Sequence, residues 1–123
     1  MMTRILLVDD DPDVIEATRM VLEKQGYEVA VGYSRQEGLD AIAKQEPDLL
    51  LLDVMMEQPD DGIAMAQQLR RSGFTKPILM LSSIGKVTDM EFGKVDDILP
   101  VNAFIDKPVQ PDVLVAQVKK LLG

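Results

Sequence analysis

Charged side chains of chemically useful types stand where three hydrophobic runs of this sequence end. Asp9 and Asp10 follow the first run, Asp53 follows the second, and Lys107 follows the third. Such runs are typical of buried parallel strands, whose carboxyl ends share one crevice where ligands bind. Three carboxylates in one crevice repel each other and favour a bound cation, and oxygen ligands favour a hard ion such as Mg²⁺. This arrangement suits phosphoryl chemistry on an aspartate.

The segments around these residues alternate between strand-like and helix-like patterns along the whole chain. Strands are expected at residues 4–8, 27–31, 48–52, 77–81 and 103–106. Helices are expected from Asp11-Pro12 to Gly26, from Ser34 to about Gln45, from Ile63 to Gly73, within residues 85–102, and from Pro111 onward. Five strands and five helices in alternation predict an α/β fold, a flavodoxin-like doubly wound parallel sheet of order 2-1-3-4-5. This order places the first and third strands side by side, so that Asp9, Asp10 and Asp53 meet.

Several local signals support these helices. Asp11 is expected to cap the first helix, with Asp13 in its first turn, and Ser34 with Glu37 forms a capping box. Three methionines are interpreted as core filler: Met20, Met65 and Met80.

Composition excludes several classes of function. The 123 residues predict one domain, 1–123, without an output domain in this chain, and the net charge of −8 argues against direct binding of nucleic acid. The absence of cysteine excludes disulfides and thiolate metal sites, and the absence of histidine excludes an imidazole base or ligand from this chain. No apolar run approaches the roughly 18 residues that span a bilayer, and no signal peptide is evident, so we expect a cytoplasmic protein without membrane insertion.

Four motifs, each at a predicted strand end, carry a family resemblance: residues 8–12 (VDDDP), 52–56 (LDVMM), 77–82 (PILMLS) and 104–108 (FIDKP). In this order they resemble the receiver domain of two-component response regulators, a family that includes single-domain chemotaxis receivers. The resemblance covers nearly the whole chain.

The resemblance implies a phosphoacceptor and a metal site. Asp53 would accept a phosphoryl group from a phosphohistidine in a Mg²⁺-dependent reaction, which would make the chain a phosphoprotein carrying an aspartyl phosphate. The metal-binding residues would be Asp9, Asp10, Asp53 and Met55. Asp10 would bind Mg²⁺ directly, Asp9 mainly through water, and Met55 through its backbone carbonyl.

It also implies a switch. Lys107 would pair with the phosphoryl oxygens, and Ser82 would hydrogen-bond to the phosphoryl group and move toward it, with Ser83 as a competitor for this role. Phe104 would then rotate inward, although an aromatic residue beside a sheet is equally well explained as core.

The implied partners are a sensor histidine kinase or a phosphotransfer protein, and a downstream target on the face of the fourth helix, fifth strand and last helix. A phosphorylation-dependent homodimer is a further expectation. The chain would catalyse only its own phosphorylation and dephosphorylation, and so would not be an enzyme in the usual sense. The alternatives are a pseudo-receiver that binds without phosphorylation, a phosphatase or phosphotransferase, and a flavodoxin-like cofactor binder.

Self-dephosphorylation is expected to be slow. Met55 and Ile84, two residues after Asp53 and Ser82, are apolar, whereas side chains at these family positions help to admit or orient the hydrolytic water. We expect the purified phosphoprotein to lose its phosphoryl group over minutes to hours, measured by intact mass. A half-life of seconds would contradict this prediction.

Overall fold

Strands and helices alternate along the chain in the computed structural model. The structure describes residues 3–53, 61–83, 101–107 and 110–122. Within these ranges, only the backbone is described for Asp61, Ser82, Ser83, Asp106 and Lys107. The strands are β1 (Arg4–Val8), β2 (Glu28–Gly32), β3 (Leu49–Asp53), β4 (Ile78–Ser83) and β5 (Ala103–Lys107). The helices are α1 (Pro12–Lys24), α2 (Arg35–Lys44), α3 (Asp61–Arg71) and α5 (Pro111–Leu122). The helix predicted within residues 85–102 falls almost entirely outside the described residues.

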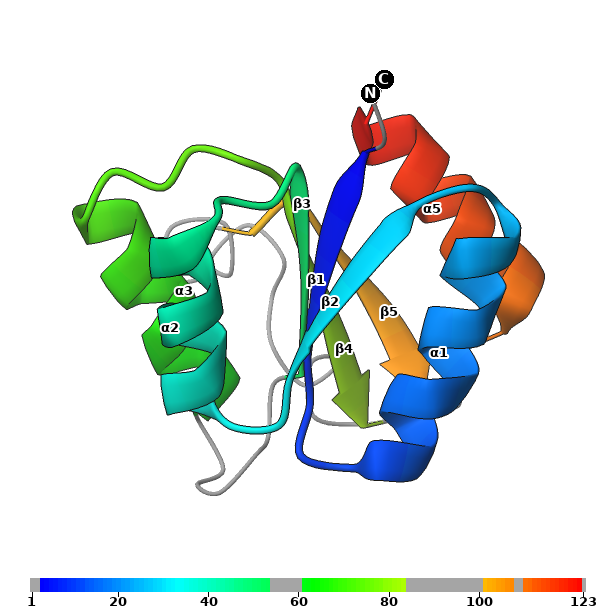
Figure 1. The fold of residues 1–123 in the computed structure, drawn as a ribbon, viewed down its shortest axis with the longest axis horizontal. Helices are drawn as coiled ribbons and strands as arrows, with labels where there is room; N and C mark the ends of the chain where they lie inside the picture. Colours follow the sequence, from blue (N-terminus) through cyan, green and yellow to red (C-terminus); the bar gives the residue numbers. More distant parts are fainter. Residues whose placement is uncertain (1–2, 54–60, 84–100, 108–109, 123) are drawn as a thin grey trace.

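The five strands form one parallel sheet of order β2-β1-β3-β4-β5, which confirms the predicted topology. β1 and β3 are neighbours, with Val8 opposite Leu52. β2 and β3 each begin and end one residue later than predicted, which makes Asp53 the last residue of β3, and β4 also begins one residue later, at Ile78. The carboxyl ends of the strands lie along the lower edge of the sheet in Figure 1.

Helices cover both faces of the sheet, α2 and α3 on one and α1 and α5 on the other (Figure 1). Alternate residues of β1 therefore enter two separate cores: Leu6 and Val8 join the α2–α3 side, and Ile5 and Leu7 join the α1–α5 side. β3 is buried at every position. Burial on both faces explains why its sequence is an unbroken leucine run and not an alternating pattern.

The start of α1 follows the predicted signals. The side chain of Asp11 accepts hydrogen bonds from the backbone N–H groups of Asp13 and Val14, at 2.9 and 3.5 Å. Pro12 occupies the first turn, where its missing N–H is not needed. The cap fixes the point at which the chain leaves the end of β1 and turns into α1.

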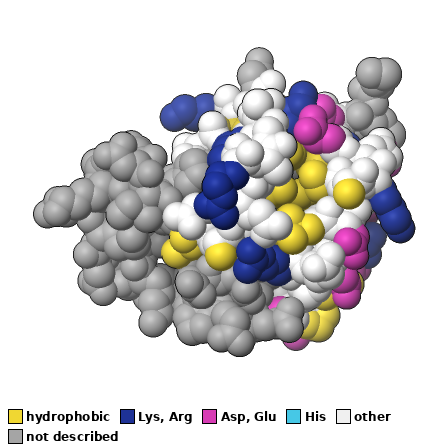
Figure 2. Space-filling model, turned by 90° about the vertical axis from the view of Figure 1, so that its left-hand side faces the viewer, with side chains coloured by type: hydrophobic (Ala, Val, Ile, Leu, Met, Phe, Trp, Pro, Cys, Tyr) yellow, Lys and Arg dark blue, Asp and Glu magenta, His cyan; other side chains and the backbone are white. Residues whose placement is uncertain are grey.

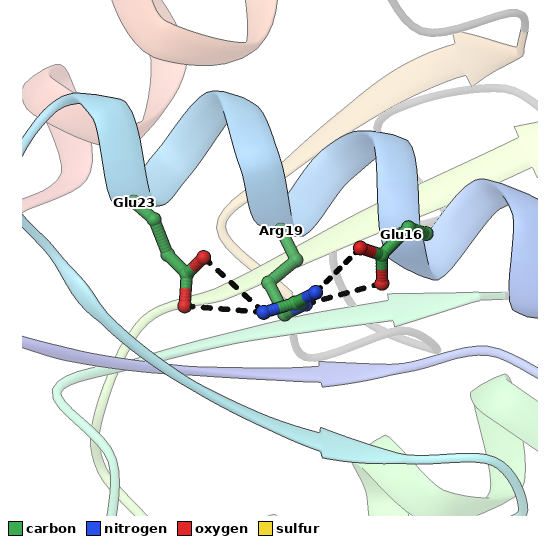
Figure 3. A network of polar contacts seen from close by, with 3 residues as sticks. All are labelled: Glu16, Arg19 and Glu23. Atoms are coloured by element: carbon green, nitrogen blue, oxygen red, sulfur yellow. Dashed lines mark hydrogen bonds and ion pairs between the residues drawn. The ribbon is translucent and has the colours of Figure 1, made fainter.

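An exposed ion-pair network runs along α1 (Figure 3). The guanidinium of Arg19 binds Glu16 one turn before it and Glu23 one turn after it. The hydrogen bond and the charge of Glu16, followed by the charge of Glu23, raise the pKa of Arg19. These contacts lie on the solvent side of the helix, and favour its helical conformation over the unfolded chain.

The two predicted glycine stops are also present. Gly26 follows the cap of α1 with φ of 91°, and Gly73 follows α3 with φ of 101°. A residue with a side chain would be strained in this left-handed region, so these positions require glycine to end each helix. At α2, the Ser34 hydroxyl accepts from Glu37 N–H at 3.1 Å, while the Glu37 carboxylate accepts from Tyr33 N–H at 3.0 Å.

The prediction for the methionines is correct for Met65 and Met80, which are fully buried, and wrong for Met20, which is 61% exposed. Met20 lies two residues after the buried Thr18, which places it on the outer side of α1. On the opposite side of the molecule, over α2 and α3, Figure 2 shows small hydrophobic areas among basic, acidic and other groups.

Gly38 allows α2 to approach the sheet closely. A Cβ atom at this position would lie 2.8 Å from a methyl group of Val8 and 2.9 Å from the terminal methyl group of Met65. Val8 precedes Asp9, so this contact supports the strand end that carries the acidic residues.

We predict that Gly38→Val lowers the free energy of unfolding by about 1–3 kcal/mol, because the added methyl groups overpack this contact. Ala43→Val, at an exposed position of α2, is the matched control and should cost only about 0.5 kcal/mol through helix propensity. Urea denaturation monitored by circular dichroism measures both. Equal losses in the two variants would contradict the proposed close contact.

Candidate functional site

Three carboxylates converge at the carboxyl edge of the sheet, as the sequence predicts. One oxygen from each of Asp9, Asp10 and Asp53 lies within 4.8 Å of the other two. Asp9 is 2% and Asp53 is 5% exposed, whereas Asp10 is open to solvent. The cluster therefore combines two buried carboxylates with one that is exposed, and a ligand could reach the cluster from the side of Asp10.

Backbone contacts position Asp9. Its N–H donates to the carbonyl of Gly32 at 3.1 Å, which extends the β1–β2 pairing by one residue. Its carboxylate accepts from the N–H of Asp11 at 3.0 Å. Because Asp11 also caps α1, the start of this helix and the orientation of the Asp9 carboxylate are coupled.

Asp53 is placed by the sheet itself. It is opposite Leu81 of β4 and follows four fully buried leucines of β3. Next to Asp9, a cavity of about 10 Å³ is lined mainly by apolar side chains of β1, α1, β3 and β4, with Thr18 and Asp9 as its polar members. Apolar surroundings reduce screening, so the charge of Asp9 interacts more strongly with its neighbours than it would in water.

The donor set fits a hard divalent cation. All three side chains offer carboxylate oxygens, which Mg²⁺ prefers, and Mg²⁺ usually retains several water ligands on its open side. The exposed Asp10 leaves room for such water molecules. A bound Mg²⁺ would offset the mutual repulsion of the carboxylates.

The remaining predicted site residues are placed only in part. Ser82 of β4 is opposite Asp106, and Lys107 is opposite Ser83, so the strand pairing brings Ser82 and Lys107 to the same edge of the sheet as Asp53. The structure describes only the backbone at these two positions. Met55 lies outside the described residues.

Phe104 is half-buried and packs against the core on the α2–α3 side of the sheet. It therefore contributes to the core, as one of the two interpretations of this residue predicts. A rotation of its side chain stays a prediction.

A family model described as the response regulator receiver domain matches residues 5–119. The chain belongs to this family. The match includes the acidic cluster and every described strand apart from the first residue of β1.

Curated proteins that match this chain are described as response regulators. The chain is 40% identical over 125 residues to response regulator MprA of Mycobacterium bovis and of Mycobacterium tuberculosis, and the match covers 99% of this receiver domain. It covers 51% of those proteins, so the chain spans about half the length of the curated relatives it matches.

Solved structures agree with the fold. A response regulator receiver domain protein (CheY-like) from Methanospirillum hungatei superposes with a TM-score of 0.86 at 26% identity, covering 99% of this chain and 94% of the other. The receiver domain of NtrX from Brucella abortus gives a TM-score of 0.82 at 25% identity, with coverage of 96% and 97%.

Among the described residues, no helix has the length and apolar character needed to cross a bilayer.

The crowding of the carboxylates leads us to a prediction about the free energy of unfolding. Without divalent ions, Asp9→Asn should raise the free energy of unfolding by about 1–3 kcal/mol, because it removes one like charge while the amide oxygen still accepts from Asp11 N–H. The same change should reduce the stabilisation that Mg²⁺ confers on the wild type. Thermal unfolding with and without Mg²⁺ measures both effects.

Asp13→Asn is the matched control, because Asp13 is an exposed acid in the first turn of α1. This variant should lose a few tenths of a kcal/mol through the helix dipole and keep the full response to Mg²⁺. If Asp9→Asn destabilised the ion-free protein as Asp13→Asn does, repulsion within the cluster would be refuted.

Proposed function

We propose that this receiver domain accepts a phosphoryl group on Asp53 from a phosphohistidine, in a Mg²⁺-dependent reaction, and so acts as a phosphorylation-controlled signalling switch. The observation that carries the proposal is the convergence of Asp9, Asp10 and Asp53 within 4.8 Å at the carboxyl edge of the sheet. The family membership supports the same conclusion. The chain contains no histidine, so the phosphohistidine belongs to a partner.

The chemistry requires positioning and charge neutralisation more than covalent assistance. A carboxylate oxygen of Asp53 attacks phosphorus, an O–P bond forms, and the N–P bond to the donor histidine breaks, with the electron pair returning to the imidazole. Asp53 is well suited to this role, because the pairing of β3 with β4 places it at the end of a buried strand, and its two acidic neighbours would provide ligands for the cation. Asp10 would hold the cation directly, Asp9 mainly through water, and the Met55 carbonyl would add a further ligand.

Lys107 and Ser82 are the residues that we propose for the phosphoryl oxygens. The ammonium group of Lys107 would neutralise developing negative charge, and the hydroxyl group of Ser82 would donate a hydrogen bond. The strand pairing supports this assignment, since it carries both residues to the edge at which Asp53 lies.

The output is a shift between two conformations that differ in their contacts with the phosphoryl group. Ser82 would move toward the phosphoryl group and Phe104 would turn inward. Phe104 is suited to such a change because it is only half-buried against the core. A change of this kind would alter the surface around β5 and α5, which we propose as the docking face for a downstream protein or for a second copy of the chain.

The proposed partners are a sensor histidine kinase or phosphotransfer protein and a downstream effector protein. We place this phosphoryl transfer in the cytoplasm, without membrane insertion. The net charge of −8 argues against direct contact with nucleic acid. The domain, 1–123, would catalyse its own phosphorylation and dephosphorylation only.

Acetyl phosphate provides a test without a kinase. We expect the intact mass of the wild type to increase by one phosphoryl group when Mg²⁺ is present, and not when it is chelated. Asp53→Ala should not react, and Lys107→Ala should react at least about tenfold more slowly, because it lacks a charge that stabilises the transition state. Asp40→Ala, at an exposed position of α2, is the control and should react like the wild type.

Folded wild type that binds Mg²⁺ but gains no mass, from acetyl phosphate or from a phosphorylated phosphotransfer protein, would overturn the proposal in favour of a pseudo-receiver. Sustained turnover of a generic phosphate ester would instead indicate a phosphatase.

A further inference from the structure

Asn102 pairs with the first residue of β4 through both its backbone and its side chain. Its N–H donates to the carbonyl of Ile78 at 2.9 Å, and its side-chain oxygen accepts from the N–H of Ile78, also at 2.9 Å. Asn102 directly precedes β5, so these two bonds hold the start of this strand against the start of β4.

Arg70 holds Asn102 from the last turn of α3. One guanidinium nitrogen donates to the carbonyls of Phe74 and Lys76 at 2.9 and 2.8 Å, and the other donates to the side-chain oxygen of Asn102 at 3.1 Å. The guanidinium also lies over the Phe74 ring, 5.7 Å from its centre. The planar fork of arginine allows these contacts at the same time, which lysine could not reproduce. We call these contacts the Arg70–Asn102 clamp.

The clamp lies at the start of β5. The register of β5 against β4 also decides where Lys107 lies at the end of the strand. Within the described sheet β5 is an edge strand and pairs with β4 alone. A slip of one residue would exchange its two faces and is opposed by the burial of Ile105. A slip of two residues keeps the faces, but moves Lys107 by about 7 Å along the edge of the sheet.

Burial alone does not oppose a two-residue slip, because the same face of β5 stays buried. The hydrogen bonds between Asn102 and Ile78 do oppose it, because a slip would break them. The side-chain oxygen of Asn102 meets the Ile78 N–H only in the observed register, in which Ser82 is opposite Asp106 and Ser83 is opposite Lys107. Arg70 keeps that oxygen in place from outside the sheet.

We propose that Arg70 and Asn102 are positioning residues for phosphoryl transfer, because their clamp sets the β5 register that brings Lys107 to Asp53. This inference rests on the function proposed above for Lys107 and Asp53. Neither residue touches the reacting atoms, and both act through the register of β5.

The test compares Arg70→Ala, Asn102→Ala and the double variant with the wild type. At saturating Mg²⁺ and below the unfolding temperature of each variant, we expect each single change to slow phosphorylation by acetyl phosphate about tenfold. The double variant should be no slower than the worse single variant, because both changes break one unit. The affinity for Mg²⁺, measured by calorimetry, should stay at the wild-type value, because the acidic cluster lies at the end of β3 and in the loop after β1, away from the clamp.

Two variants serve as controls. Arg71→Ala removes the exposed arginine next to Arg70 and should leave the rate unchanged. Asn102→Asp keeps an acceptor for Ile78 N–H and for Arg70, and should retain the wild-type rate. If Arg70→Ala does not fold, Arg70→Lys takes its place, since it keeps the charge and loses the fork.

Wild-type phosphorylation rates in both single variants would overturn the positioning role of the clamp. A loss of Mg²⁺ affinity that parallels the loss of rate would also overturn it, because it would indicate general destabilisation. Hydrogen exchange at the β5 amides that donate to β4, which alternate from Asn102 to Phe104, separates this inference from the function on which it rests. If the wild type does not react with acetyl phosphate, the proposed function fails. The clamp is then supported if exchange at these amides accelerates in Arg70→Ala and Asn102→Ala but not in Arg71→Ala, and it is overturned if exchange is unchanged.

Discussion

The close approach of three carboxylates at one edge of the sheet is the constraint on which the rest of this structure depends. Asp9, Asp10 and Asp53 lie close together because β1 and β3 are neighbours in a register that places Val8 opposite Leu52, so that Asp9 and Asp53 follow at the same level. The buried positions of Asp9 and Asp53 limit the screening of their charges by water. A cation bound at such a site would offset the crowding of negative charge and would stabilise the folded protein.

The rest of the fold holds this edge of the sheet in place. Both faces of β3 are buried, and glycine at position 38 lets α2 pack against the end of β1, next to Asp9. Asp9 itself is held by backbone groups on either side, from Gly32 and Asp11. The two buried acids therefore have little freedom to move apart, whereas the exposed Asp10 is free of this confinement. Such pre-organisation is what charge-driven chemistry requires of a protein site.

Local sequence signals predicted the elements well, and their errors have physical causes. The cap at Asp11 and the glycines at positions 26 and 73 mark helix ends because each satisfies a backbone requirement that few residues can meet. The error at Met20 arose because hydrophobic character was taken as burial, although its place on α1 faces solvent. The contact between Arg70 and Asn102 had no sequence signal, because it joins residues 32 positions apart through side-chain geometry.

The sequence by itself determined the alternation of strands and helices, the strand order and the placement of acidic residues at strand ends. These follow from hydrophobic periodicity, from the handedness of parallel crossovers and from the rule that strand ends share one crevice. Only the tertiary structure decided that Asp9 and Asp53 are buried while Asp10 is exposed, and that Arg70 reaches the start of β5. Burial and long-range hydrogen bonds depend on how the helices pack against the sheet, and local patterns carry no information about that packing.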